Sequence, residues 1–199
     1  MSKLRDKPKK STKNIKEISI IGRITRLVVM ATLVALTGCA GLGKMKEVSF
    51  TDKAATDKAL VNIVRRSVFM GDGANVEMWD GERFIGTLAA GKVLQYQAEP
   101  GEHTFMAYIQ GNWGTARGTL EAGKTYYLKF MSGFGPVSLG VASAEDERID
   151  EWKAMKTVAM DQASSKAVPE KYLAKARLTL EKVEAGTVIP TPITAANAQ

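Results

Sequence analysis

Turn signals recur in the middle of the sequence at intervals of about ten residues, and they constrain the fold more than any other feature. They are Asp80-Gly81, Ala90-Gly91, Pro100-Gly101, residues 111–114 and Ala122-Gly123. The segments between them have the length of strands, and residues 75–79 alternate between polar and apolar side chains. Short strands separated by turns at this spacing are typical of antiparallel sandwiches and small barrels. We therefore expect a mainly β fold, a small antiparallel β-sandwich, over residues 59–143.

Beyond the glycine-rich segment 133–140, apolar residues recur at helical spacing. A first stripe within residues 145–162 consists of Ile149, Trp152, Met155 and Ala159. A second helix is expected to carry Pro169 in its first turn and to stop before Gly186. Its apolar face would consist of Leu173, Ala176, Leu180 and Val183. These patterns predict a C-terminal α-helical extension over residues 144–186.

The two apolar stripes are expected to pack as a helical hairpin against the sheet. The alternative is that they dock a partner or the membrane face. Residues 187–199 contain Pro190 and Pro192, which cannot continue a helix. We expect these last residues to form a disordered tail.

The N-terminal segment has the layout of a signal peptide. Arg23 and Arg26 precede an apolar run of ten residues, 27–36, which is too short for the roughly 20 residues that span a bilayer. The run closes on Leu36-Thr37-Gly38-Cys39, which resembles the lipobox of bacterial lipoproteins. The alternative is a buried free cysteine at the end of an ordinary hydrophobic helix.

The lipobox resemblance implies that Leu36, Thr37 and Gly38 are recognised by the lipoprotein signal peptidase, which would cleave before Cys39. Cys39 would then carry the covalent lipid, palmitate included, and no cofactor is expected besides this modification. Residues 1–38 would be the signal peptide and residues 39–58 a tether to the folded domain. Acyl chains contribute about 0.8 kcal/mol per buried CH₂, so several chains give a durable anchor.

The residue after the cysteine bears on localisation. In the usual enterobacterial sorting pattern an Asp at this position favours retention in the inner membrane, and this chain has Ala40 instead. We therefore expect the periplasmic face of the outer membrane. An uncleaved inner-membrane anchor remains the alternative if Cys39 is not lipidated.

The positive charge of the chain belongs to the leader. The formal net charge is +7, from 28 basic and 21 acidic residues. Nine of the basic and two of the acidic residues lie before Cys39, so 19 of each sign remain from Cys39 onward. A neutral mature chain gives no support to nucleic-acid binding, and no nucleic-acid partner is expected.

The β segment also resembles a domain of unknown function, DUF2846, which is found in many bacterial lipoproteins and is similar in pattern to PEGA-type surface modules. The resemblance covers about residues 60–131 and rests on Val64-Arg65-Arg66, Trp79-Asp80-Gly81, Ile85-Gly86-Thr87-Leu88, Ala90-Gly91-Lys92, Pro100-Gly101-Glu102-His103 and residues 123–128. It implies a small all-β fold and no established activity.

Candidate chemistry is sparse. The single cysteine excludes an intramolecular disulfide and a cysteine-cluster zinc site, and His103 is the only histidine, so no metal site is expected. His103 is expected to be a strand residue whose ring bonds a backbone carbonyl. The turn carboxylates Asp80, Glu82, Glu99 and Glu102 leave an envelope hydrolase as the alternative. No Ser-His-Asp order or HExxH motif supports that alternative, so we expect no catalytic residues and no enzyme.

Trp113 is the candidate contact residue. It lies in the glycine-rich segment 111–114, where an exposed aromatic side chain could contact peptidoglycan, lipid or an envelope protein. Alternatively, it folds back over the edge of the sandwich. Together these features predict a lipid-anchored envelope lipoprotein that acts as a non-catalytic binding or structural module, an accessory of an envelope assembly.

Overall fold

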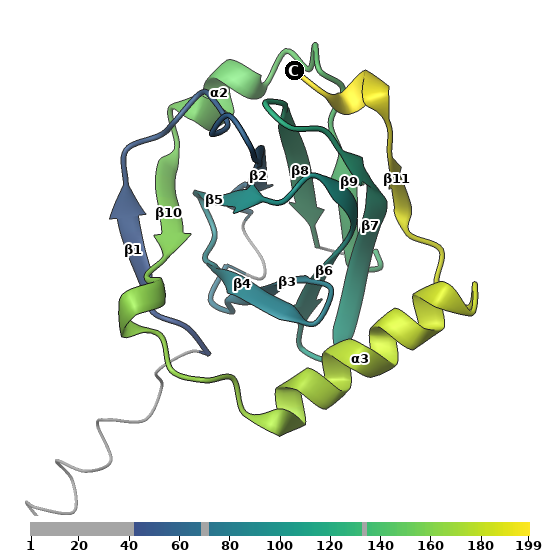
Figure 1. Cartoon of the computed structure of the whole chain (residues 1–199). Helices are drawn as coiled ribbons and strands as arrows, with labels where there is room; N and C mark the ends of the chain where they lie inside the picture. Colours follow the sequence, from purple (N-terminus) through teal and green to yellow (C-terminus); the bar gives the residue numbers. More distant parts are fainter. Residues whose placement is uncertain (1–41, 69–71, 133–134) are drawn as a thin grey trace, which may run out of the picture. The chain divides into compact units, whose positions relative to one another are not determined.

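A computed structural model describes residues 42–68, 72–132 and 135–199, and Gly41–Gln199 form one compact unit. The residues of the expected lipobox, 36–39, lie outside the described residues. The described part is mainly β with a C-terminal helix, as expected. Two sheets pack face to face (Figure 1).

A six-stranded sheet and a five-stranded sheet make up the fold. The first has the order β1 (Met45–Val48), β10 (Lys156–Met160), β5 (Lys92–Ala98), β2 (Ala59–Arg65), β8 (Thr125–Met131) and β9 (Ser138–Val141). The second has the order β11 (Thr191–Ile193), β7 (Asn112–Leu120), β6 (Gly101–Ile109), β3 (Val76–Asp80) and β4 (Arg83–Leu88). The helices are α2 (Ile149–Lys153) and α3 (Glu170–Glu184), with short 3₁₀ turns at Gln162–Ser164 and Ala195–Asn197.

The core lies between the two sheets. β2 runs antiparallel to β5 and parallel to β8, and all seven of its residues are buried. Val61 and Ile63 face the core between the sheets, whereas Val64 packs on the outer face of its sheet under α2. A strand buried on both faces contains a nearly continuous apolar run, and residues 59–64 have that composition.

Each helix covers the outer face of one sheet. Ile149 and Trp152 of α2 pack on Tyr127 of the six-stranded sheet, and the Trp152 and Tyr127 rings lie 5.8 Å apart. Ala176 of α3 packs with Trp79 of the five-stranded sheet. The helices therefore bury apolar side chains that alternation places on the outer faces of the strands.

The prediction for α3 is confirmed. Pro169 is its N-cap residue, and the helix ends before Gly186, which has φ +71°. The amide of Gly186 donates to the Val183 carbonyl at 3.0 Å, and the amide of Thr187 donates to the Lys182 carbonyl at 2.9 Å. Glycine after a helix adopts the left-handed conformation at little cost, which explains why the stop signal was reliable.

The helix expected across residues 145–162 is wrong in its second half. α2 ends at Lys153, and Lys156–Met160 form β10 between β1 and β5. Thr157 and Val158, both β-branched, are buried there. Pairing with two neighbouring strands outweighed the helical spacing of the apolar residues.

The tether and the tail also differ from expectation. Met45–Val48, within the expected tether, pair antiparallel with β10. Thr191–Ile193, within the expected disordered tail, pair parallel with β7, and the backbone of Gln199 exchanges two hydrogen bonds with Thr125 at 3.0 and 3.2 Å. Pro192 is accommodated because β11 lies at the edge of its sheet, where a strand can lack a donor.

No helix in the described part of the chain has the length and hydropathy needed to cross a membrane.

Candidate functional site

His103 is fixed on both sides by hydrogen bonds. Its Nδ1 lies 2.8 Å from both carboxylate oxygens of Asp80, and its Nε2 lies 2.7 Å from the Glu99 carbonyl. Because both nitrogens face acceptors, the geometry favours the protonated ring, and the hydrogen bond to Asp80 raises the pKa of His103. The expected bond to a backbone carbonyl is confirmed, whereas the partnership with Asp80 was not foreseen.

This histidine and its carboxylate also join the two sheets. Asp80 ends β3 and His103 lies on β6, both in the five-stranded sheet, whereas Tyr96 comes from β5 in the other sheet. The Tyr96 hydroxyl donates to Asp80 at 3.0 Å. Burial, together with the charge of Asp80, raises the pKa of Tyr96 well above its usual range. The cluster therefore links the two sheets through polar contacts. Both ring nitrogens of His103 are engaged in these contacts, so neither is available to activate a nucleophile.

The other turn carboxylates are also held by cations. Lys58 lies 2.5 Å from Glu99, and Arg117 lies 2.6 Å from Glu102. Glu82, in the turn between β3 and β4, accepts a bond of 2.7 Å from Arg177 of α3. Each of these carboxylates is therefore bonded to a basic side chain. The described residues also contain no group of three or more His, Cys, Asp or Glu side chains that could hold a metal.

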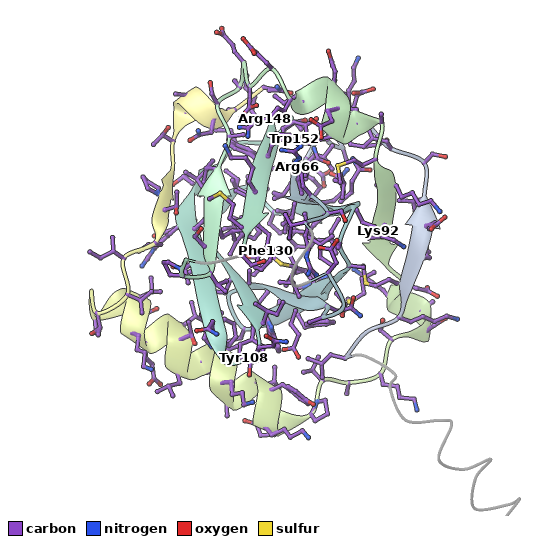
Figure 2. All side chains as sticks on the ribbon, turned by 180° about the vertical axis from the view of Figure 1, so that it is seen from behind. Arg66, Lys92, Tyr108, Phe130, Arg148 and Trp152 are labelled. Atoms are coloured by element: carbon purple, nitrogen blue, oxygen red, sulfur yellow. The ribbon has the colours of Figure 1, made fainter. Side chains whose placement is uncertain are left out.

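Trp113 lies on β7 and is half-buried. Its ring centroid is 4.8 Å from that of Tyr108 on the partner strand β6, and it packs on the cluster under α3. Figure 2 shows Tyr108 beside α3, and Lys175 of that helix lies over the Tyr108 ring. The alternative in which the tryptophan folds back is the one observed, and a partner contact through the remaining exposed part of Trp113 stays a prediction.

A cavity of about 360 Å³ lies at the other end of the described unit, where the ends of β2 and β8 meet α2. Figure 2 shows Arg148, Trp152 and Arg66 gathered at this end, with Phe130 further toward the middle. The lining consists of Val64, Arg65, Arg66, Ser67, Val68, Lys129, Phe130, Met131, Ser132, Arg148 and Trp152. Among the described residues, the lining holds four cationic side chains and no carboxylate, histidine or cysteine.

Two of these cations share a carboxylate just outside the cavity. Asp146 accepts bonds of 2.8 and 2.7 Å from Nε and Nη2 of Arg148, and Lys129 lies 3.5 Å from it. The bond from Arg148 holds the pKa of Asp146 far below its usual range. The Arg148 guanidinium also lies 5.3 Å from the centre of the Trp152 ring. These contacts fix the position of Arg148 at the cavity.

Arg65 anchors the base of the cavity. It is 2% exposed, its Nη1 donates to the Ala74 and Leu88 carbonyls at 2.6 and 3.0 Å, and its guanidinium lies 5.5 Å from the Phe130 ring centre. Burial lowers its pKa from the ordinary value of 12.5. Arg65 therefore joins the end of β2 to the five-stranded sheet.

Arg65 is buried, whereas the side chain of its neighbour Arg66 is 59% exposed. Side chains alternate along a strand, so Arg65 shares the inward face of β2 with Val61 and Ile63. An arginine that continues an apolar alternation was the available signal. The contribution of α2 had no such local signal, because Arg148 and Trp152 are more than 80 residues from β2 in the sequence.

No family model, curated protein or solved structure matches this chain.

Proposed function

We propose that the chain is an envelope lipoprotein, anchored by lipid on Cys39, whose folded part is a non-catalytic binding module. The lipobox at Leu36–Cys39 supports the anchor. Leu42, the first residue that the structure describes, lies three residues after Cys39, so the described fold lies within the proposed mature chain. The likeness of residues 60–131 to DUF2846 belongs to the same proposal, and envelope proteins or peptidoglycan are the partners it allows.

The chemistry of the cavity carries the binding part of the proposal. Within the described residues its lining offers cations, aromatic rings and two serines, but no carboxylate, histidine or cysteine. Small-molecule sites are commonly concave and largely apolar, with a few polar groups that fix orientation. A cavity with these properties favours recognition of a ligand over its hydrolysis.

The hydrolase alternative has less support. Asp80 and His103 resemble two members of a catalytic triad, but Nε2 of His103 faces the Glu99 carbonyl instead of a nucleophile. Glu82, Glu99 and Glu102 are each bonded to a lysine or arginine. Hydrolysis at these turns would require breaking existing ion pairs before any substrate could be engaged.

Separation of inner and outer membranes on a density gradient tests the localisation. We expect the wild-type chain in the outer-membrane fraction. Cys39→Ala should stay in the inner membrane with its leader attached, because the acceptor thiol and the cleavage site are lost. Ala40→Asp is the matched variant, and it should be lipidated and cleaved but retained in the inner membrane. Equal distributions for the wild type and Cys39→Ala would contradict the proposal.

A further inference from the structure

The cavity beside α2 presents cationic donors toward any ligand that enters it. Arg66, Lys129 and Arg148 line it, whereas the carboxylates that bind them, Asp146 and Glu151, do not. Arg65 also lines the cavity, and Asp72, which is bonded to Ser67 and to the amide of Val68, is absent from the described lining. An anion in the cavity would therefore meet N–H donors before it met a carboxylate.

Arg148 and Arg66 differ in how firmly they are held. Arg148 uses Nε and Nη2 on Asp146, and the described residues supply no acceptor for its Nη1. Arg66 has a 59% exposed side chain and forms an ion pair of 3.3 Å with Glu151. The guanidinium of Arg148 is thus held in position before a ligand binds, whereas that of Arg66 can turn toward the ligand. Such a pair of guanidinium groups suits a tetrahedral oxyanion.

Apolar side chains lie next to these donors. Val68 is 43% exposed and Met131 is 48% exposed, and both line the cavity together with Phe130 and Trp152. Large apolar side chains left exposed beside a cavity mark a surface that a ligand or partner can cover, which removes apolar area from water. A fully hydrophilic anion would leave this surface in water.

We propose that the cavity binds a phosphate-headed amphiphile. The phosphate would be held by Arg66, Lys129 and Arg148, and the first part of the hydrocarbon chain would lie against Met131, Val68 and Phe130. The volume of about 360 Å³ lies within the usual range for small-ligand sites. This inference rests on the proposed binding function, since a chain anchored in a bilayer has phosphate-headed lipid within reach.

Calorimetric titration of the full-length mature protein in nonionic detergent tests the assignment with three probes. n-Hexyl phosphate should bind saturably, and inorganic phosphate should bind about tenfold more weakly, because burying two methylenes is worth about that factor. Hexanol should show no saturable binding. These arms separate a lipid headgroup from free phosphate, and equal affinity for hexyl phosphate and inorganic phosphate would overturn the amphiphile assignment.

Two pairs of variants locate the site. Arg66→Gln should weaken both phosphates by about tenfold, the loss expected for one charge-assisted hydrogen bond. Its control is Arg117→Gln, which removes an arginine bonded to Glu102 away from the cavity and should change neither affinity. Met131→Gln should weaken hexyl phosphate and leave inorganic phosphate unchanged. Its control is Leu178→Gln on α3, where the side chain is 52% exposed.

Similar losses in Arg66→Gln and Arg117→Gln would show a general effect of charge and overturn the site. Thermal unfolding followed by circular dichroism establishes that the fold is retained, when each variant unfolds at the same temperature as the wild type. If Arg66→Gln fails to fold, Lys129→Gln removes another cation from the lining of the cavity and replaces it in the test. A protein that carries lipid on Cys39 but fails these titrations overturns the ligand class and leaves the anchor standing.

Discussion

Single polar residues determine how the two sheets are held together. Arg65 and the Asp80–His103 pair are buried or nearly so, and each connects elements that are distant in sequence. The side chain of His103 is only 12% exposed and that of Asp80 only 10%. At this degree of burial a hydrogen-bonded ion pair is weakly screened by solvent, and removing one partner leaves the other buried without a compensating charge.

The pH dependence of stability should show the His103–Asp80 contact directly. The folded pKa of His103 is raised above its ordinary 6.5, so its stabilisation is complete below pH 6.5 and is lost as pH rises through the folded value. Each unit of difference is worth about 1.4 kcal/mol. Urea unfolding between about pH 5 and 8 should therefore give a free energy of unfolding that falls toward higher pH.

His103→Gln is the control for this dependence, because His103 is the only histidine. The variant should be less stable at low pH and should lack the decline above pH 6.5. A wild-type protein that gains stability as pH rises through this range would contradict the assignment of an imidazolium bonded to Asp80.

At the level of elements, local signals predicted those parts of the fold that depend on local structure. Pro169 and Gly186 bound α3 because each acts through its own backbone conformation. β10 was missed because Met155 and Ala159 continue the helical spacing of α2, and only the presence of β1 and β5 on either side makes a strand. β1 and β11 are too short to show a period of their own.

The cavity illustrates the same limit for a site. The basic residues at positions 65 and 66 are visible in the sequence, but the residues that surround them in the fold are not. Arg65 is inward because the register of β2 makes it so, and Arg148 reaches the cavity because α2 folds over the sheet. A site assembled from three distant elements cannot be read from spacing along the chain.

The position of β11 depends on the missing side chain at Gly118. Gly118 pairs with Ile193, and a Cβ at Gly118 would lie 2.1 Å from the Ile193 carbonyl oxygen. Gly118→Ala should displace β11 and lower the free energy of unfolding by about 1–3 kcal/mol, a usual cost of overpacking. Amide hydrogen exchange should become faster at Thr191 and Ile193.

Gly73→Ala is the matched substitution, because its Cβ would have nothing within 4 Å and should leave exchange in β11 unchanged. Unchanged protection of β11 in Gly118→Ala would contradict the pairing of the C-terminal segment with β7.

At the scale of the whole molecule, both ends of the described chain are tied into the sheets. The N-terminal strand β1 extends one sheet, and the C-terminal segment contacts both sheets through β11 and Gln199. Figure 1 shows this last segment running beside β7 from α3 to the opposite end of the unit. The six residue steps from Cys39 to Met45 reach at most about 20 Å. A lipid on Cys39 would therefore hold the fold close to the membrane surface.

Intact-mass spectrometry of the membrane-extracted protein, beside Cys39→Ala, tests this anchoring most directly. The proposal predicts a wild-type chain that begins at Cys39 and carries the added mass of acyl chains, whereas Cys39→Ala should carry none. An unmodified wild-type chain that retains residues 1–38 would contradict it. The excess positive charge of the leader would then belong to the mature protein, and its partners would have to be reconsidered on that basis.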